Sequence, residues 1–300
     1  MSESRVAMNR IARTAWGRLP APGKGALKKA WAGYARVTSR GRLLPDYLII
    51  GTQRGGTTSL YKYLAEHPAL GRALTKEIRF FDLNYEKGVA WYRSRFPSYR
   101  YKNLVKERDG LDLVVGEASP DYMFHPRVPE RVARLIPSVR LIVLLRNPAD
   151  RAYSHYWHQR KRGHEELSFE EAVESEPERL RGELEKMRAS DSYYSYERHH
   201  HSYLARGIYV DQLRAWMEVF PREQFLIERS EDFFTDPAAV FDRVLRFLGL
   251  PGRQLRRYEK FNAFTSDAMA PSTRDRLVDY FHIHNQRLFE LLGRDFGWNA

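Results

Sequence analysis

One stretch, residues 45–64, limits the fold of this chain more than any other (PDYLIIGTQRGGTTSLYKYL). It opens with a short apolar run, Tyr47 to Ile50, of the length typical of a buried strand. A turn rich in glycine and threonine follows, and leucine and tyrosine then recur at helical spacing. A strand, a glycine-rich turn and a helix start form a cradle for an anion, because glycine lets the backbone approach closely and the first N–H groups of a helix have no partner within it. We therefore predict a phosphate-binding loop.

The predicted loop differs from that of the nucleotide triphosphatases. Their pattern, G-x-x-x-x-G-K-S/T, would run from Gly51 to Gly56, but Thr57 occupies the position of the lysine. The only cation within the loop is Arg54, which precedes a pair of glycines. A tight strand-to-helix turn without a ligand is the alternative for this stretch taken alone. We expect an anion to be bound by Arg54 together with Gly55, Gly56, Thr57, Thr58 and Ser59.

Three further apolar runs predict additional strands, at residues 111–116, 139–145 and 224–228. The run at 139–145 is almost continuously apolar, which is typical of a parallel strand covered on both faces. Segments with helical periodicity separate these runs, and alternating strands and helices favour a parallel sheet. We therefore predict an α/β fold over residues 45–300, a single domain with a P-loop-like parallel β-sheet flanked by helices on both faces.

A second anion site is predicted where the run at 139–145 ends. Arg146 follows it directly, an Asn-Pro pair then suits the start of a helix, and Ser154 lies on that helix. Ligands of parallel α/β sheets bind at the carboxyl ends of the strands, so Arg146 and Ser154 should lie at the same edge as Arg54. An arginine fork with a nearby hydroxyl suits a phosphate group. The alternative for Arg146 is an ion pair at a helix cap.

Glu77 is a candidate general base. It lies between two cations, Lys76 and Arg79, directly before a Phe-Phe pair that should be buried. A carboxylate held near cations and against buried aromatic rings can act as a base. The alternative is an ordinary surface ion pair.

Residues 191–207 are rich in tyrosine and histidine (DSYYSYERHHHSYLARG). Aromatic rings with polar tips suit the surfaces of sugars and phenols, so we expect a loop here that lines the site of an acceptor molecule. An ordinary surface loop is the alternative. Three successive histidines, residues 199–201, cannot all reach one ion from regular structure, and we predict no metal site.

Most of the positive charge lies near the start of the chain. The formal net charge is +12, and residues 1–44 hold ten Lys and Arg residues against one acidic residue. We expect a poorly packed basic extension that is a solvated tail, with contact to anionic membrane lipid, nucleic acid or a polyanionic substrate as the alternative. The chain has no cysteine, no segment of the secretory-signal type and no apolar stretch of about 20 residues. We therefore expect a cytoplasmic protein with, at most, peripheral membrane contact.

Four motifs, in the same order along residues 45–298, resemble those of the PAPS-dependent sulfotransferases. They are GTQRGGTTSL, KEIRFFDLNYEKGVAWY, LLRNPADRAYSHYWHQ and SEDFFTDPAAVFDRVLRFLGL. The resemblance is nearest to the heparan sulfate N- and O-sulfotransferase branch and its bacterial relatives. Four motifs in order form a more specific signal than any one of them.

The resemblance implies a role for each predicted site. Residues 51–59 match the loop that holds the 5′-phosphosulfate of PAPS (3′-phosphoadenosine 5′-phosphosulfate), and Arg146 with Ser154 match the site of its 3′-phosphate. Glu77 matches the catalytic base, and Arg54 stands where the family usually has a lysine. The implied reaction is an in-line transfer of the sulfuryl group to an acceptor hydroxyl or amine, without a metal ion or a covalent enzyme intermediate.

Two other functions remain open at this stage. A P-loop kinase or other phosphotransferase would need a carboxylate for Mg²⁺, and Glu117, after the run at 111–116, is its best candidate. A non-catalytic protein could bind polyanions through the basic extension, although no nucleic-acid-binding motif is present and we expect no nucleic-acid partner. We expect a sulfotransferase with a small-molecule or glycan acceptor, a carbohydrate or glycolipid.

Overall fold

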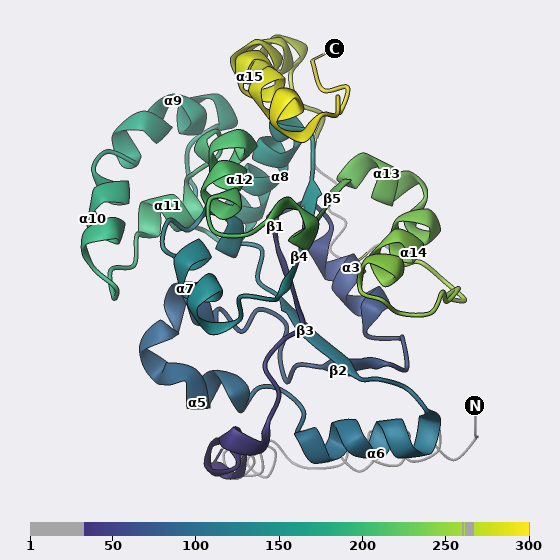
Figure 1. Cartoon of the computed structure of the whole chain (residues 1–300). Helices are drawn as coiled ribbons and strands as arrows, with labels where there is room; N and C mark the ends of the chain where they lie inside the picture. Colours follow the sequence, from purple (N-terminus) through teal and green to yellow (C-terminus); the bar gives the residue numbers. More distant parts are fainter. Residues whose placement is uncertain (1–32, 260, 262–266, 300) are drawn as a thin grey trace.

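The computed structural model describes residues 33–259, 261 and 267–299 (Figure 1). At its centre lies one sheet of five parallel strands in the order β2-β3-β1-β4-β5. The strands are β1 (Tyr47–Gly51), β2 (Leu70–Arg72), β3 (Val114–Ala118), β4 (Arg140–Leu145) and β5 (Phe225–Arg229). The predicted parallel α/β fold is confirmed.

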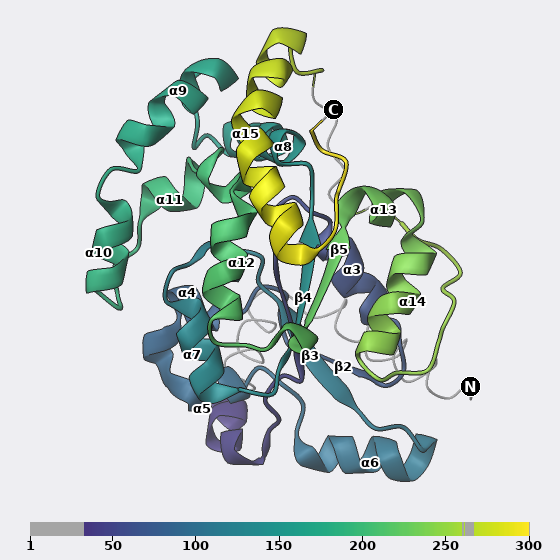
Figure 2. The same ribbon diagram turned by 45° about the horizontal axis from the view of Figure 1, so that its top comes forward.

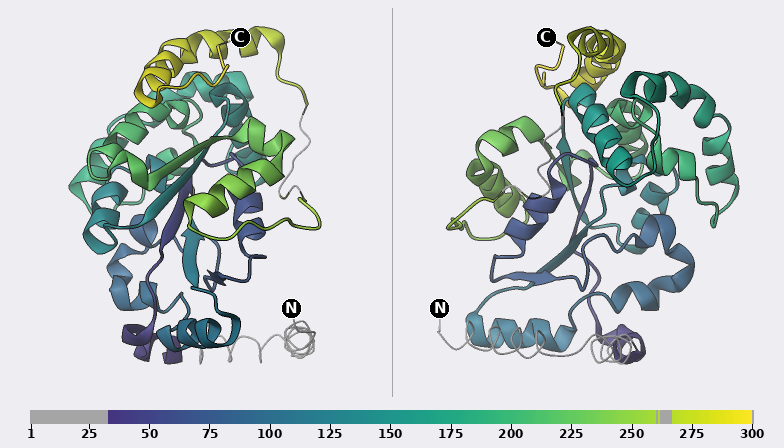
Figure 3. Two further views of the ribbon diagram at one scale, coloured as in Figure 1. Left: turned by 45° about the vertical axis from the view of Figure 1, so that its right-hand side comes forward. Right: turned by 180° about the vertical axis from the view of Figure 1, so that it is seen from behind.

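Helices cover both faces of the sheet. The view in Figure 1 has α3, α13 and α14 on one face and α7 and α12 on the other, and the views in Figure 3 agree. In Figure 2, α15 packs against α8 and α12. The helices of the described residues are α3 (Thr57–Leu64), α4 (Phe80–Leu83), α5 (Gly88–Arg93), α6 (Tyr99–Asp109), α7 (Val128–Leu135), α8 (Pro148–Lys161), α9 (Phe169–Arg179), α10 (Glu183–Ala189), α11 (Tyr196–His200), α12 (Tyr209–Met217), α13 (Ser230–Thr235), α14 (Pro237–Phe247) and α15 (Pro271–Leu292), with short 3₁₀ turns η1 (Ser39–Gly41), η2 (Tyr85–Lys87), η3 (Tyr122–Phe124), η4 (Ala205–Gly207) and η5 (Arg222–Gln224).

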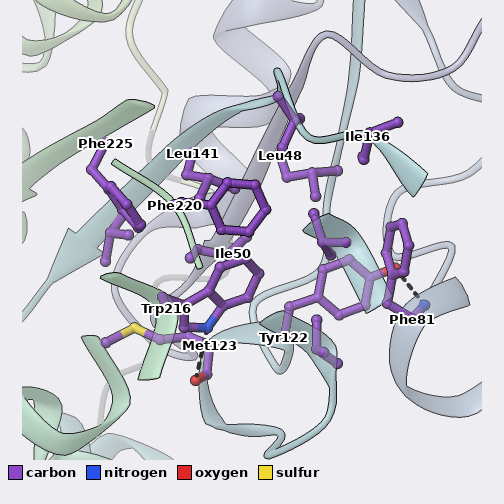
Figure 4. Packing of buried hydrophobic residues seen from close by; sticks show 14 of the residues in the cluster. Leu48, Ile50, Phe81, Tyr122, Met123, Ile136, Leu141, Trp216, Phe220 and Phe225 are labelled. Atoms are coloured by element: carbon purple, nitrogen blue, oxygen red, sulfur yellow. Dashed lines mark hydrogen bonds between the residues drawn. The ribbon is translucent and has the colours of Figure 1, made fainter. Parts of the chain in front are cut away.

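Successive side chains of the central strand enter two different cores. Leu48 and Ile50 of β1 belong to the cluster that contains Trp216 (Figure 4), whereas Tyr47 and Ile49 belong to the cluster on the α3 face. Side chains alternate between the faces of a strand, so a strand covered on both sides is apolar at nearly every position. This explains the continuous apolar runs in the sequence.

One predicted strand is shifted. The run at 111–116 predicted a strand there, but β3 is Val114–Ala118. The strand extends through Glu117, which is fully buried, because tyrosine and serine hydroxyls donate hydrogen bonds to its carboxylate. A polar residue normally ends an apolar run, and the groups that satisfy this one are not apparent from the sequence pattern.

The end of the predicted basic extension is packed against the body. Residues 33–37 are helical, Ala35 is buried, and Leu43 donates its N–H to the carbonyl oxygen of Pro97 at 3.0 Å. The guanidinium of Arg42 is buried and donates to the carbonyl oxygen of Phe96 at 2.8 Å. The prediction of poor packing is therefore wrong for this part, and residues 1–32 lie outside the described residues. None of the helices in the described ranges combines the length and apolar character needed to span a bilayer.

Candidate active site

The glycine-rich loop between β1 and α3 is fixed against the neighbouring strand β4. The N–H of Thr52 donates to the carbonyl oxygen of Leu144 at 2.9 Å, and the hydroxyl of Ser230 donates to the carbonyl oxygen of Gly55 at 2.8 Å. A β-carbon on Gly55 would lie 2.6 Å from the oxygen of Leu144, so the approach requires glycine. Gly56 has a φ of 98°, which is unstrained only for glycine. The two positions of the motif therefore require glycine for different reasons, Gly55 for lack of space and Gly56 for its positive φ.

Helix α3 begins directly after this loop. Thr57, Thr58 and Ser59 form its first turn, and no side chain of the described residues caps that end. The first turn of a helix presents backbone N–H groups and the positive end of the helix dipole, which favour an anion. The predicted strand, loop and helix start are confirmed as backbone structure.

Three predicted site residues from separate segments meet at this edge of the sheet. The Nε of Arg54 donates to the hydroxyl of Ser154 on α8 at 3.0 Å. An Nη of Arg146 donates to the carbonyl oxygen of Arg54 at 3.2 Å, and the hydroxyl of Tyr209 donates to the carbonyl oxygen of Arg146 at 2.8 Å. As predicted, Asn147 caps α8, with its side chain accepting from the second and third residues of the helix. The ends of β1 and β4 therefore place both arginines together.

The charges at this edge repel one another. Burial, together with the nearby Arg146 and Arg162, lowers the pKa of Arg54 to about 10. Burial, together with Arg54 and Arg162, lowers the pKa of His158 to about 4, so this imidazole is neutral at pH 7. A partly buried guanidinium beside other cations is stabilised by any anion that binds there.

A cavity of about 570 Å³ lies at these residues. Arg146 and Ser154 form part of its wall, and so do five loop and helix residues: Arg54, Gly56, Thr57, Thr58 and Ser59. Of the predicted cofactor-binding residues, only Gly55 does not line it, because its position is behind the loop and against β4.

Much of the remaining wall is aromatic and was not predicted. Phe233 and Phe234 of α13 line the cavity with Tyr153 of α8, and Tyr258 and Phe261 line it from the segment after α14. Arg146 lies over the ring of Phe234, 5.8 Å from its centre. The pair Phe233-Phe234 is visible in the sequence, but nothing in the sequence indicates that these rings face the glycine-rich loop. Near the rim, Arg274 of α15 donates to a carboxylate oxygen of Asp150.

Glu77 lies at the same edge of the sheet but not in this cavity. Its N–H donates to the carbonyl oxygen of Ala118 at the end of β3, the strand next to β1. Its side chain is 42% exposed and forms an ion pair with Lys76. Its φ of 59° is unusual for a residue other than glycine. The backbone thus holds Glu77 beside the end of the sheet with its carboxylate accessible.

A second, smaller cavity lies next to the Glu77 segment. Arg79 bridges Asp82 at 2.6 Å and Asp121 at 3.0 Å, and Arg206 also pairs with Asp121. Burial opposes ionisation of Asp121, but Arg79 and Arg206 outweigh it and hold its pKa well below the usual range. His199 lines the same cavity, and burial lowers its pKa to about 4.

The tyrosine- and histidine-rich segment contributes to this second cavity. Tyr193, Tyr194 and His199 lie in its wall. Part of the segment is helical, as α11 and η4, where we had expected a loop. The next two histidines point to separate partners, His200 to Gln159 at 3.0 Å and His201 to Glu197 at 2.6 Å.

Comparison with known proteins identifies the family. The model of the sulfotransferase domain matches residues 44–287. The chain belongs to the sulfotransferase family. The predicted resemblance is thereby confirmed, as is the prediction of an enzyme of this class.

Other sulfotransferases are similar over most of this chain. The membrane-associated sulfotransferase kil1 of Dictyostelium discoideum is 27% identical, over 85% of this chain and 66% of its own length. The heparan sulfate glucosamine 3-O-sulfotransferase 5 of Mus musculus is 29% identical, over 85% of this chain and 74% of its own. A human bifunctional heparan sulfate N-deacetylase/N-sulfotransferase 3 is 33% identical over 75% of this chain, which spans only 24% of that enzyme. The crystal structure of a sulfotransferase from Alicyclobacillus acidocaldarius has a TM-score of 0.66 and 29% identity, covering 86% of this chain and all of that one.

The sulfotransferase loop provides a first test. In Gly55→Ala, the new methyl group would meet the Leu144 oxygen, and the loop must move away from β4. Overpacking of this kind costs about 1–3 kcal/mol. We expect a melting temperature lower by a few degrees. Because the resemblance implies that this loop binds PAPS, we also expect an affinity for its product 3′-phosphoadenosine 5′-phosphate (PAP) reduced by about tenfold or more, measured by calorimetry.

Gly41→Ala is the matched control, because a β-carbon at Gly41 would have no atom within 4 Å. Its stability and affinity should match those of the unmodified protein. Unchanged PAP binding in Gly55→Ala would show that the loop position does not matter for the nucleotide.

Proposed function

We propose that this protein transfers a sulfuryl group from PAPS to a hydroxyl or amine of an acceptor molecule. The observation that supports this most is the meeting of Arg54, Arg146 and Ser154 with the start of α3 in one cavity. Two groups of anion-binding donors at the ends of β1 and β4 suit a ligand with phosphate at two positions. The aromatic wall suits an adenine ring.

The residues divide between the two ends of the nucleotide. The loop at residues 51–59 would bind the 5′-phosphosulfate through Arg54, through backbone N–H groups and through the hydroxyls at the start of α3. Arg146 and Ser154 would bind the 3′-phosphate. Arg54 would stabilise the charge that develops on the sulfuryl group and on the departing phosphate oxygen. Because a guanidinium does not give up its proton, Arg54 would act by its charge and not as an acid.

Glu77 would be the general base. An accessible carboxylate at the same edge of the sheet as the loop can take the proton from the acceptor as it attacks sulfur in line with the leaving oxygen. Lys76, the present partner of Glu77, would be displaced or shared when the acceptor binds.

The kinase alternative is disfavoured by a specific observation. Glu117, the best candidate for binding Mg²⁺, is fully buried, and both carboxylate oxygens accept hydrogen bonds from protein groups. It therefore cannot reach the cavity. The loop also lacks the lysine of the nucleotide triphosphatases.

The acceptor in this proposal is a carbohydrate or glycolipid. Two of the relatives are named for heparan sulfate, and the tyrosines and histidine of residues 191–207 lie beside the Glu77 segment in the second cavity. The proposal also includes peripheral contact of the basic extension, residues 1–44, with anionic lipid in the cytoplasm. It is supported by their basic composition and by the name of the Dictyostelium relative.

Glu77→Gln tests the base. The change preserves size and removes the proton acceptor, so turnover should fall by roughly 10²-fold or more while PAP affinity stays within about twofold. Glu86→Gln, at an exposed position in η2, is the control and should retain full turnover. Normal turnover in Glu77→Gln would exclude Glu77 as the base.

Arg146→Ala tests the 3′-phosphate site. Loss of a charge-assisted hydrogen bond should weaken PAP binding by about 1.5–3 kcal/mol, or roughly 10- to 100-fold, in calorimetric titrations with EDTA present. Binding of AMP, which lacks the 3′-phosphate, should hardly change. Arg100→Ala, exposed on α6, is the control. Equal losses for PAP and AMP would place the 3′-phosphate elsewhere, and binding of Mg²⁺-ATP in preference to PAP would favour a kinase.

A further inference from the structure

The segment that carries Glu77 is held to the sheet by its backbone N–H groups, one after another. Glu77 donates to the carbonyl oxygen of Ala118 at 3.0 Å, as described above, and Ile78 donates to a carboxylate oxygen of Glu117 at 3.2 Å. The next N–H groups donate to side-chain hydroxyls. Arg79 donates to Ser119 at 3.2 Å, and Phe80 donates to Tyr122 at 2.8 Å. Phe81 also donates to Tyr122, at 3.3 Å (Figure 4).

Glu117 lies at the centre of these bonds. One carboxylate oxygen accepts from the hydroxyls of Tyr92 at 2.7 Å and Tyr122 at 3.0 Å. The other accepts from the hydroxyl of Ser119 at 2.8 Å and from the N–H of Ile78. Because Ser119 and Tyr122 donate to Glu117, their oxygen lone pairs are left to accept from the backbone of residues 79–81. The carboxylate thus orients the hydroxyls that hold the segment.

The arrangement suits a group that only accepts hydrogen bonds. All four groups that contact the carboxylate are donors, and an ionised carboxylate has acceptor sites for all of them. Full burial raises the pKa of Glu117 to about 7, although the three hydroxyl donors oppose this. Burial of a carboxyl group is unfavourable unless its hydrogen bonds are satisfied. Its presence in a strand that is otherwise apolar therefore suggests that its hydrogen bonds have a structural role nearby.

The backbone of the segment that carries Glu77 has an unusual conformation that needs such support. Glu77 and Arg79 have φ values of 59° and 55°, in the left-handed region that residues other than glycine rarely occupy. Such conformations persist only where the surroundings enforce them. Ile78, which lies between these two residues, donates its N–H directly to Glu117. Arg79 donates its N–H to Ser119, whose hydroxyl in turn donates to Glu117.

We propose that Glu117 is a positioning residue, whose buried carboxylate fixes the backbone of residues 77–81 and thereby the direction in which Glu77 presents its side chain. The inference rests on the proposed function, in which Glu77 is the base. It assigns to Glu117 no contact with the nucleotide or the acceptor.

Glu117→Gln is the main test. The amide has nearly the same size but introduces N–H donors toward groups that already donate, so part of the network must break. A small displacement of a catalytic group can reduce turnover about 10²-fold. We expect kcat with PAPS and acceptor to fall at least about tenfold, while PAP affinity stays within about twofold. Hydrogen exchange of the amides of residues 77–81 should accelerate in the unliganded protein, and that of β1 and β4 should not.

Two further variants keep the test decisive if Glu117→Gln folds poorly. Tyr122→Phe removes both a donor to Glu117 and the acceptor for Phe80 and Phe81, whereas Tyr92→Phe removes only a donor to Glu117. Loss of kcat and faster exchange at 77–81 should be greater for Tyr122→Phe. Tyr101→Phe, exposed on α6, is the control and should leave both unchanged.

The outcomes separate the two proposals. Unchanged kcat in the Glu117 and Tyr122 variants, or losses of kcat and PAP affinity in parallel with faster exchange throughout the protein, would overturn the positioning role. Failure of the unmodified protein to bind PAP or transfer sulfuryl groups would overturn the proposed function instead. The exchange measurement on residues 77–81 would still decide whether Glu117 fixes the segment.

Discussion

The close approach of the glycine-rich loop to β4 is the constraint on which the rest of the site depends. Thr52 donates its N–H to the carbonyl oxygen of Leu144, and a β-carbon at Gly55 would clash with that oxygen, so the loop can take this position between two neighbouring strands only with glycine there. With the loop in that position, Arg54 reaches Ser154 on α8, and Arg146 reaches the backbone of Arg54. Residues that are about a hundred positions apart in the sequence therefore meet at one surface, because parallel strands bring their carboxyl ends to a common edge.

This surface has a high electrostatic free energy when no anion is bound. Arg54 is partly buried beside Arg146 and Arg162, and its lowered pKa reflects that environment. A ligand with several negative charges would offset the desolvation of Arg54 and its repulsion by the neighbouring cations. Removal of these unfavourable energies would add to the binding free energy of the ligand. If the proposed function is right, the site should prefer multiply charged nucleotides over singly charged ones, and salt should weaken their binding.

The sequence predicts those parts of the site that depend on short-range pattern. The strand-loop-helix at 45–64 and the capped helix after Arg146 are local signals, and both are confirmed. The placement of β3 was wrong, because Glu117 is accommodated by Tyr92 and Tyr122, which approach it from other elements. The three-residue strand β2, helix α6 and the aromatic wall of the cavity were also missed. Strand β2 and the aromatic wall depend on contacts between distant segments, which no periodicity within the segment itself records. Helix α6 has local signals that were overlooked, because Ser98 caps its start and Gly110 follows its end in the left-handed conformation.

The packing of residues 33–43 determines how the molecule would be oriented if its basic extension were bound to a surface. Residues 33–43 lie with α6 at one end of the molecule, and α15 lies at the other, near the ends of the strands that carry the loop (Figure 1). Arg42 and Leu43 join the extension rigidly to the chain at residues 96–97. Attachment through the extension would therefore leave the cavity lined by Arg54 and Arg146 directed outward, within reach of molecules in the surrounding solution.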